Sequence, residues 1–368
     1  MRKTPIIFLV AALPMAVNAA NTEFSFGGFI KMDAMLSTYS DGDITDGYGR
    51  DYYAPSQIVS GTEPDTPELD MTARNSRFNF KTVTALEDGK SISSFIELDF
   101  STTGGGNEVV SNSYVPRLRH AFVKYDGFLV GQTWSNFMNV GALPEVADFI
   151  GPSESTVFIR QPQVRYTAGD LSVSLENPQT TGAGDSGDNG MIPDITASYK
   201  IKADNMDLTA ALLVRQLSYD GPVEDDDTST MGFGVNLSGK VMIGEDDLKF
   251  SATMGNGVGR YVGLGAVADA ALVGDDLEAS ETTAAFIAYR HHWNSEWRSS
   301  AVYGMLSADY DDSVAAGVTD ASSVRVNIMR SPVKSLTYGA EYSTATVERV
   351  GGDDVSMNRI YFTTKYAF

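Results

Sequence analysis

The chain has 368 residues, with 48 Asp and Glu against 27 Lys and Arg, three His and no Cys. A formal net charge of -21 argues against nucleic acid as a partner, because phosphate binding needs a basic face. The lack of Cys excludes a disulfide framework, a thiol nucleophile and Cys-based metal sites.

The first predicted element is a secretory signal peptide at residues 1–19. A basic start precedes an apolar stretch from Ile6 to Val17, and small residues follow it. This three-part layout is typical of an export signal, and the apolar stretch is too short to span a bilayer stably. We therefore expect cleavage after Ala19 and a mature domain at 20–368.

The mature chain begins with a long alternation of apolar and polar residues at 22–39. Phe24 and Ile30 share one parity, whereas Lys31 and Asp33 share the other. A period of two over this length predicts one long strand with an apolar face and a polar face. Strands of soluble proteins usually have only about five or six residues, so this strand is unusually long.

The same alternation recurs along the rest of the chain, and no segment shows sustained helical periodicity. With the first strand it predicts sixteen strands. The other fifteen are expected at about 71–86, 91–101, 114–125, 128–136, 157–168, 171–177, 190–201, 207–217, 230–243, 247–256, 282–293, 297–307, 322–331, 335–347 and 356–368.

The connections alternate strictly between long loops and short turns, with seven short turns and eight long loops. An even strand count with this alternation predicts an all-β fold: a 16-stranded antiparallel transmembrane β-barrel of the porin type, with short periplasmic turns and long extracellular loops. A soluble β-sandwich has shorter strands, and a β-helix should show a fixed repeat, which the sequence lacks. Lipid cannot satisfy a free strand edge, so the barrel must close.

The polar parity of the strands should face the lumen, and it carries many charged residues. On strands two to six it contains more basic than acidic residues, which favours a basic wall; the alternative is that the arginines merely pair with the lumenal acids. His120 and Phe122 are expected on the outward parity. The predicted pore and substrate-binding residues are Arg77, Lys81, Arg117, Arg119, Arg160, Gln161, Gln163 and Arg165, with the acids Glu97 and Asp99 between them.

The global charge conflicts with this basic wall. The first long loop, at 40–70, holds eight acids, and residues 220–227 hold five more. Conduction depends on the field at the constriction, so we expect a channel that prefers small anionic solutes. The alternative is a non-selective or cation-preferring porin governed by the acidic loops. These loops could contact lipopolysaccharide through divalent cations or simply be solvated.

Sixteen strands enclose an aqueous channel that something must narrow. The long loop at 136–158 is unusually apolar for an exposed segment, with residues such as Leu143, Val146 and Phe149. We expect it to fold into the lumen as a constriction loop beside or opposite the basic wall. The alternative is that it covers a neighbouring subunit.

Enzymatic and metal-binding motifs are weak. The segment "DGDITDG" at 41–47 resembles a calcium loop, but Asp46 occupies the position of the turn glycine and no distal Glu fits. The three His residues do not form a hydrolase constellation with a nucleophile. We expect no enzyme activity, no cofactor and no metal, and keep an outer-membrane barrel enzyme only as a remote alternative.

Several segments resemble those of the DcaP-like outer-membrane porins of Gram-negative bacteria, in the expected order along nearly the whole mature chain. They are "LVGQTWSNFMN" (129–139), "RQPQVRYT" (160–167), "SLENPQT" (174–180), "PDITASY" (193–199) and "GNGVGRY" (255–261).

This resemblance implies a homotrimer of sixteen-stranded barrels in the cell outer membrane. It also implies diffusion of small anionic solutes, such as dicarboxylates, past constriction arginines. Some members of the family carry an N-terminal helical segment. Because the first strand here starts almost at the cleavage site, we expect no such stalk and a trimer held by barrel-wall contacts.

The last strand ends at Phe368, with Tyr366 two residues before it. As the sixteenth strand it should pair with the first and close the barrel, with its apolar parity against lipid. A terminal aromatic pattern of this kind resembles the signal that the barrel-assembly machinery reads. We therefore expect Tyr366 and Phe368 to act in assembly.

Overall fold

The structure is a computed structural model, and the residues it describes are 21–40, 44, 47–58, 66–102, 111–182, 190–220, 228–311, 314, 317–352 and 354–368. The signal peptide expected at 1–19 and most of the acidic segment 220–227 lie outside them. In the described part of the chain, no helix is long and apolar enough to cross a membrane.

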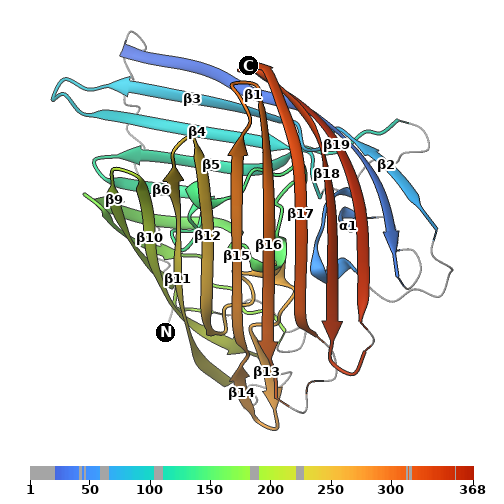
Figure 1. The fold of residues 1–368 in the computed structure, drawn as a ribbon. Helices are drawn as coiled ribbons and strands as arrows, with labels where there is room; N and C mark the ends of the chain where they lie inside the picture. Colours follow the sequence, from blue (N-terminus) through green and yellow to red (C-terminus); the bar gives the residue numbers. More distant parts are fainter. Residues whose placement is uncertain are drawn as a thin grey trace, which may run out of the picture.

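Sixteen long strands, each antiparallel to its neighbours, close into one barrel (Figure 1). The first strand pairs with the last in a continuous register from Phe29–Ala367 to Tyr39–Met357, so the ring has no free edge. The predicted fold class is confirmed. The barrel strands are β1 (Thr22–Tyr39), β3 (Arg77–Ala85), β4 (Ser91–Asp99), β5 (Arg117–Tyr125), β6 (Phe128–Trp134), β7 (Arg160–Ala168), β8 (Leu171–Glu176), β9 (Asp194–Ala203), β10 (Met206–Tyr219), β11 (Thr228–Ile243), β12 (Asp246–Asn256), β15 (Glu281–His292), β16 (Trp297–Asp309), β17 (Val318–Val333), β18 (Leu336–Arg349) and β19 (Val355–Ala367).

The second predicted strand is split in the structure. Its first part is β2 (Glu68–Thr72), which pairs with 33–37 of β1, and its second part is β3, which pairs with 22–29. The break at 73–76 is stabilised by the buried Asn75, whose side-chain amide donates to Asp33 at 3.0 Å. The alternation of apolar and polar residues does not reveal this break, because β2 and β3 both pair with β1 and so lie in the same part of the barrel wall.

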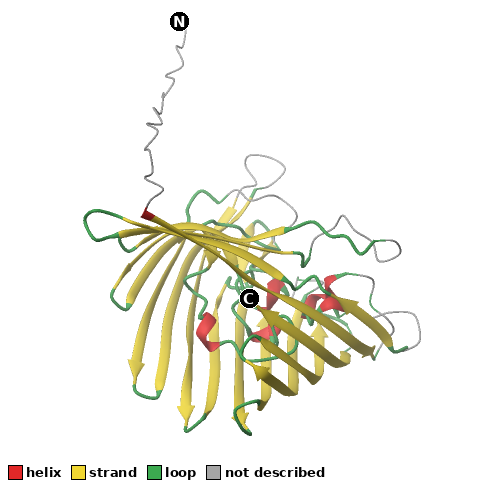
Figure 2. Cartoon of the chain, turned by 90° about the horizontal axis from the view of Figure 1, so that it is seen from above, coloured by secondary structure: helices red, strands yellow, loops and turns green. Residues whose placement is uncertain are grey.

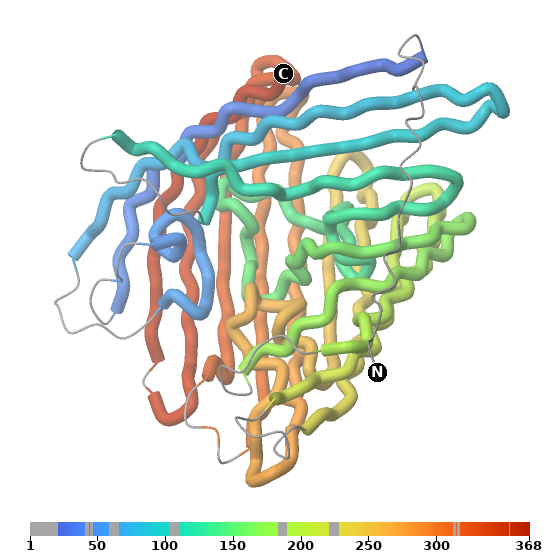
Figure 3. Tube along the Cα trace, turned by 180° about the vertical axis from the view of Figure 1, so that it is seen from behind, coloured from blue at the N-terminus to red at the C-terminus, as the bar shows by residue number. Residues whose placement is uncertain are grey.

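The alternation of the sequence corresponds to two chemically different barrel faces. On β10, for example, Leu212 and Val214 are exposed on the outside, whereas Leu213 and Arg215 are buried inside. An apolar outer face is what a hydrocarbon environment requires of a barrel. Figure 3 shows the tilted wall from β3 to β9 (cyan to green) lying opposite the wall from β15 to β19 (orange to red).

A bulge in β5 overturns the expected orientation of two residues. Glu97 pairs with His120 and Leu98 pairs with Leu118, so Arg119 is one extra residue in the ladder. Such a bulge shifts the parity of every later residue in the strand. His120 and Phe122 were expected on the outer face, but they face the lumen, where His120 lies 3.0 Å from the Thr133 hydroxyl.

The segment 135–159 between β6 and β7, which we call the inward segment, contacts inward side chains on several sides of the barrel. Lys31 of β1 donates to the carbonyl of Ala147 at 2.8 Å, and Lys249 of β12 donates to Leu143 at 2.7 Å. Short 3-10 turns at Val140–Ala142 and Ser153–Ser155 compact the segment. Seen from above, short helical turns lie within the ring of strands (Figure 2).

Two other long connections also pack inward, which the sequence did not reveal. In the first, Gly49 and Asp51 of helix α1 (Tyr48–Asp51) and most of residues 52–58 are buried. Arg359 of β19 donates to the carbonyl of Gly49 at 2.9 Å. In the loop after β12, Tyr261 and Val262 are buried in the same cluster as Phe137. That loop also carries an unpredicted hairpin, β13 (Ala270–Val273) and β14 (Asp276–Ala279). The described part of the first acidic loop is therefore not simply solvated.

Candidate functional site

Arginines of the β3–β7 wall stack on aromatic rings beside and within the inward segment. The Arg160 guanidinium lies 4.4 Å from the centre of the Trp134 ring, and Arg119 lies 5.7 Å from the same ring. Phe149 of the segment lies 5.6 Å from Arg77 and 5.8 Å from Arg119. Guanidinium groups favour such aromatic faces, so the rings help hold the cations in a fixed arrangement. We call Arg77, Arg117, Arg119 and Arg160 the arginine cluster.

Two members of the arginine cluster are neutralised by acids of β4. Arg117 forms a bidentate pair with Asp99, with both nitrogen–oxygen distances at 2.8 Å. Arg119 donates to Glu97 at 2.7 Å and to Asp99 at 2.8 Å, and both Arg119 and Asp99 are buried. Forked pairs of this kind are strong and geometrically specific. The donors of these two arginines are thus largely used within the wall.

The other two members make no hydrogen bond to a carboxylate of the described residues. Among the described residues, the nearest carboxylate oxygen to Arg77 is 3.9 Å away on Glu97, and no ion pair within 4.0 Å involves Arg160. The Nε atom of Arg77 and the Nη1 atom of Arg160 are buried and have no hydrogen-bond partner within the described structure. The cluster thus contains four cations and two carboxylates, and its excess charge rests on Arg77 and Arg160.

The two glutamines predicted for the pore hold the base of the inward segment instead of standing free. Gln161 donates to Glu176 at 2.6 Å and to the Tyr261 hydroxyl at 2.8 Å. Gln163 donates to the backbone carbonyl of Trp134 at 3.0 Å. Both side chains are buried. The amide groups of both glutamines are thus used to position the loops around the lumen, whereas the side-chain oxygen of Gln161 is buried without a partner in the described structure.

Arg165 and Lys81 do not join the arginine cluster. Arg165 donates to the carbonyl of Trp134 at 2.6 Å and to the Gln163 side chain at 2.9 Å. Together with Lys81 it lies within electrostatic range of Lys124, as does Lys200. These four cations lie nearer the short-turn end of the barrel and form a second group.

Acids of the inward segment anchor it to the opposite wall. Glu145 accepts from Arg298 at 2.6 and 2.7 Å and from Arg290 at 3.2 Å. Burial raises the pKa of Glu145, but these hydrogen bonds and charges outweigh it and hold the pKa below its ordinary range. Asp148 accepts from the fully buried Arg325 of β17 at 2.8 Å. Glu145 is thus ionised at neutral pH.

Several features of this site were not predicted from the sequence. Trp134, Phe149 and Phe158 supply the rings beside the arginines, and Lys124 and Lys200 enlarge the second basic group. The two lysines could have been found from the sequence, because each is a cation close to a predicted short turn. The aromatic partners could not have been found in this way, since stacking between a loop and a barrel strand joins residues that are distant in sequence. In the described ranges, no group of three or more His, Cys, Asp or Glu could hold a metal ion.

A closed sixteen-stranded barrel with an apolar outer face and charged inner walls defines a transmembrane channel of the porin class. The sequence matches the family model described as DcaP outer membrane protein over residues 13–368, so the chain belongs to the DcaP outer membrane protein family. The resemblance seen in the sequence is confirmed, and the chain is an outer-membrane protein.

Solved structures support the same assignment. The outer membrane channel DcaP of Acinetobacter baumannii is 25% identical, with a TM-score of 0.79 over 95% of this chain and 98% of that chain. OmpT of Vibrio cholerae in its trimer form is 12% identical (TM-score 0.57; 94% and 99% covered), and the anion-selective porin of Comamonas acidovorans is 10% identical (0.56; 94% and 100%). The latter two share the fold alone. Among curated proteins, none matches this chain.

Proposed function

We propose that this porin conducts small solutes by passive diffusion and prefers anions, dicarboxylates among them. The observation that carries the proposal is the excess positive charge of the arginine cluster on Arg77 and Arg160. A guanidinium without a hydrogen-bonded carboxylate keeps its positive charge uncompensated, and its planar fork of donors is the geometry that matches a carboxylate. Two such groups on one stretch of wall offer a dianion more attraction than a monoanion.

The segment 136–158 is proposed to form the constriction. Its aromatic ring at Phe149 lies against Arg77 and Arg119, and its acids pair with the opposite wall. The field of a charge acts most strongly where walls are close and water is scarce. A solute passing this segment would therefore meet the arginine cluster at short range.

The second candidate is a channel without selectivity, or with cation preference, governed by the acidic loops. A net charge of -21 favours it, but the acids of the first long loop nearest the arginine cluster are paired, Asp51 with Arg74 and Asp70 with Arg50. Other described acids, such as Glu87, Asp88 and Asp204, are exposed on turns. Salt screens such exposed charges beyond about 8–10 Å, whereas the buried cluster is screened much less. The cluster should therefore dominate the field in the pore.

Uptake by vesicles tests the solute class. Vesicles carrying the purified protein are expected to take up labelled succinate faster than a neutral sugar of similar size, because the cluster attracts the dianion. Vesicles without protein serve as the control. Faster uptake of the neutral solute would refute the anion preference.

We propose export through the signal peptide at 1–19 and assembly as a homotrimer, with no enzyme activity. OmpT of Vibrio cholerae, which shares this fold, has been solved as a trimer, and this supports the proposed assembly. The outer membrane surface supplies lipid and lipopolysaccharide, which the acidic loops could meet through divalent cations.

Deleting Phe368 is expected to lower the yield of folded barrel in the outer membrane more than it lowers conduction. The Phe368 ring lies 5.4 Å from that of Phe26 on β1, and its backbone exchanges hydrogen bonds with Gly28 at 3.1 and 3.3 Å. Loss of these contacts weakens the closing strand pair, and the barrel-assembly machinery loses its proposed signal at Tyr366 and Phe368.

The measurement is the amount of folded protein in outer-membrane fractions, with single-channel conductance of the protein that does insert. Replacing Val333 with Ala is a matched control, because it removes an exposed apolar side chain near another short turn. An unchanged yield after deletion of Phe368 would refute the assembly role.

A further inference from the structure

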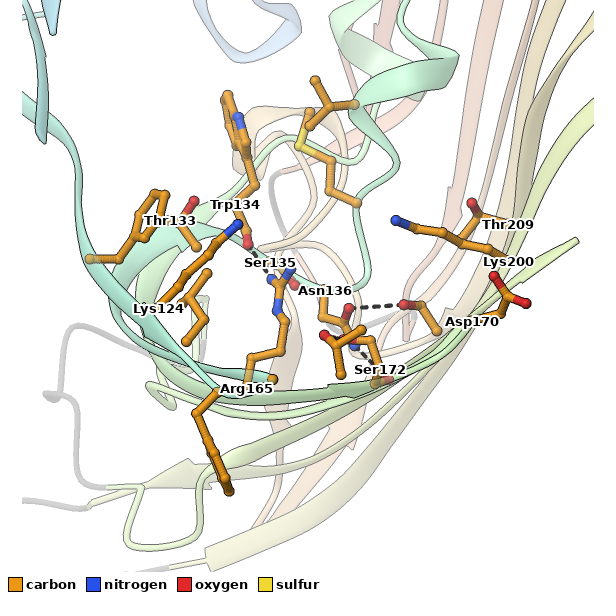
Figure 4. Close-up of a pocket in the computed structure, with 18 of the residues that line it drawn as sticks. Lys124, Thr133, Trp134, Ser135, Asn136, Arg165, Asp170, Ser172, Lys200 and Thr209 are labelled. Atoms are coloured by element: carbon orange, nitrogen blue, oxygen red, sulfur yellow. Dashed lines mark hydrogen bonds between the residues drawn. The ribbon is translucent and has the colours of Figure 1, made fainter. Parts of the chain in front are cut away.

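A cavity of 660 Å³ lies in the lumen at the short-turn end, beneath the start of the inward segment. Strands β4 to β10 and the residues after β6 line it (Figure 4). Lys124 of β5, Arg165 of β7 and Lys200 of β9 all contribute to its lining. Figure 4 shows the ammonium groups of Lys124 and Lys200 directed into the cavity from opposite sides.

The three cations of this cavity are not neutralised by acids. Among the described residues, Arg165 donates its hydrogen bonds to neutral acceptors, the Trp134 carbonyl and the Gln163 side chain. No ion pair in the described structure involves Lys124 or Lys200. Holding like charges together without counterions is unfavourable, so the cavity attracts an anion.

Acids at the cavity are confined to its rim. Asp126 lies on a short turn and is paired with Lys90 at 2.6 Å. Asp170 lies exposed on the next turn. Hydroxyl groups complete the wall with neutral donors, at Ser91, Ser93, Thr133, Thr167, Ser172, Ser198 and Thr209.

Trp134 separates this cavity from the arginine cluster. Its ring stacks under Arg160 at 4.4 Å, while its carbonyl accepts from Arg165 at 2.6 Å. Arg160 and Arg165 are five residues apart on β7, so their Cα atoms lie about 16 Å apart at a strand rise of ~3.3 Å per residue. An anion that leaves the arginine cluster toward the short-turn end would therefore meet a second basic site a short distance along the pore.

We propose that this cavity is a second binding site for small dianions such as dicarboxylates, reached from the periplasmic mouth without passing the arginine cluster. Lys124 and Lys200 hold the two charged ends of the anion, and hydroxyls of the wall hydrogen-bond to it. The site rests on the proposed function, because an anion that comes from outside the cell reaches this cavity only through the pore. Two sites in series let each bound anion leave toward the next, which keeps binding compatible with flux.

Block of chloride current by succinate, added to one side of a planar bilayer at a time, tests this site. The full mature protein should be blocked at lower succinate concentration from the short-turn side than from the loop side. In K124Q/K200Q the half-blocking concentration from the short-turn side should rise by about tenfold or more, because two charged hydrogen-bond donors are lost. The double variant K202Q/K334Q is the matched control, since neither residue lines the cavity.

The variant R77Q/R160Q separates this site from the proposed function. It should lose chloride preference over potassium yet keep the block from the short-turn side. Block of K124Q/K200Q at the wild-type concentration, or equal block of the wild type from both sides, would overturn the second site. A cation-selective wild type whose sided block is still lost in K124Q/K200Q would refute the arginine constriction and support the second site.

Discussion

Replacing both Arg77 and Arg160 with Gln is expected to remove the anion preference of the pore. The arginine cluster then holds two cations and two carboxylates, so its excess charge disappears. A unit charge about 4 Å from an ion contributes ~1 kcal/mol even in water, so two of them alter the permeability ratio by more than about tenfold. The measurement is the chloride-to-potassium permeability ratio in planar bilayers.

Two control variants sharpen this result. R330Q/K334Q also removes two positive charges, but Arg330 is already paired with Glu296 near the short turns, so selectivity should hardly change. R77K/R160K keeps both positive charges but loses the forked pair of donors that a guanidinium offers a carboxylate. It should therefore keep its preference for chloride over potassium while losing its preference for succinate over chloride. An unchanged ratio in R77Q/R160Q would mean that other cations set the selectivity.

Replacing Asp148 with Ala is expected to detach the inward segment and raise single-channel conductance severalfold. Asp148 accepts from Arg325 at 2.8 Å, from the Tyr361 hydroxyl at 3.2 Å and from the Tyr53 amide at 3.3 Å. Removing one partner of a buried pair costs roughly 3–5 kcal/mol, because Arg325 is left buried with less compensation. Phe149 would leave the arginines, so anion preference should fall as well.

Conductance and protease sensitivity of the inserted protein measure this detachment. E296A is the matched control, because Glu296 is an exposed acid paired with Arg330 on the barrel rim. A folded D148A barrel with wild-type conductance and protease resistance would show that other contacts, such as those of Glu145, hold the segment.

Much of the fold could be predicted from the sequence because lipid imposes a strict rule on barrel strands. One face must be apolar over the whole hydrocarbon thickness, so the alternation at Phe24, Ile30 and their counterparts located all sixteen strands. The exceptions are local irregularities. The bulge at Arg119 adds one residue to β5 that has no partner in β4. The break at 73–76 divides the second predicted strand into two parts that both pair with β1.

The candidate site was only partly predictable, for a different physical reason. The sequence placed the arginines on one wall, yet it could not tell which of them keep free donors. That depends on cross-strand register, which sets Asp99 opposite Arg117 and leaves Arg160 beside a tryptophan. The stacking of Phe149 on this wall depends on how a long loop folds, and no local pattern encodes it.

The reversal potential of the wild-type channel in a KCl gradient tests the central claim most directly. The arginine cluster predicts the sign expected of a pore in which chloride is more permeant than potassium, at neutral pH and moderate salt. The opposite sign, with potassium more permeant, would mean that the acidic loops govern the pore and that the arginine cluster does not set its selectivity.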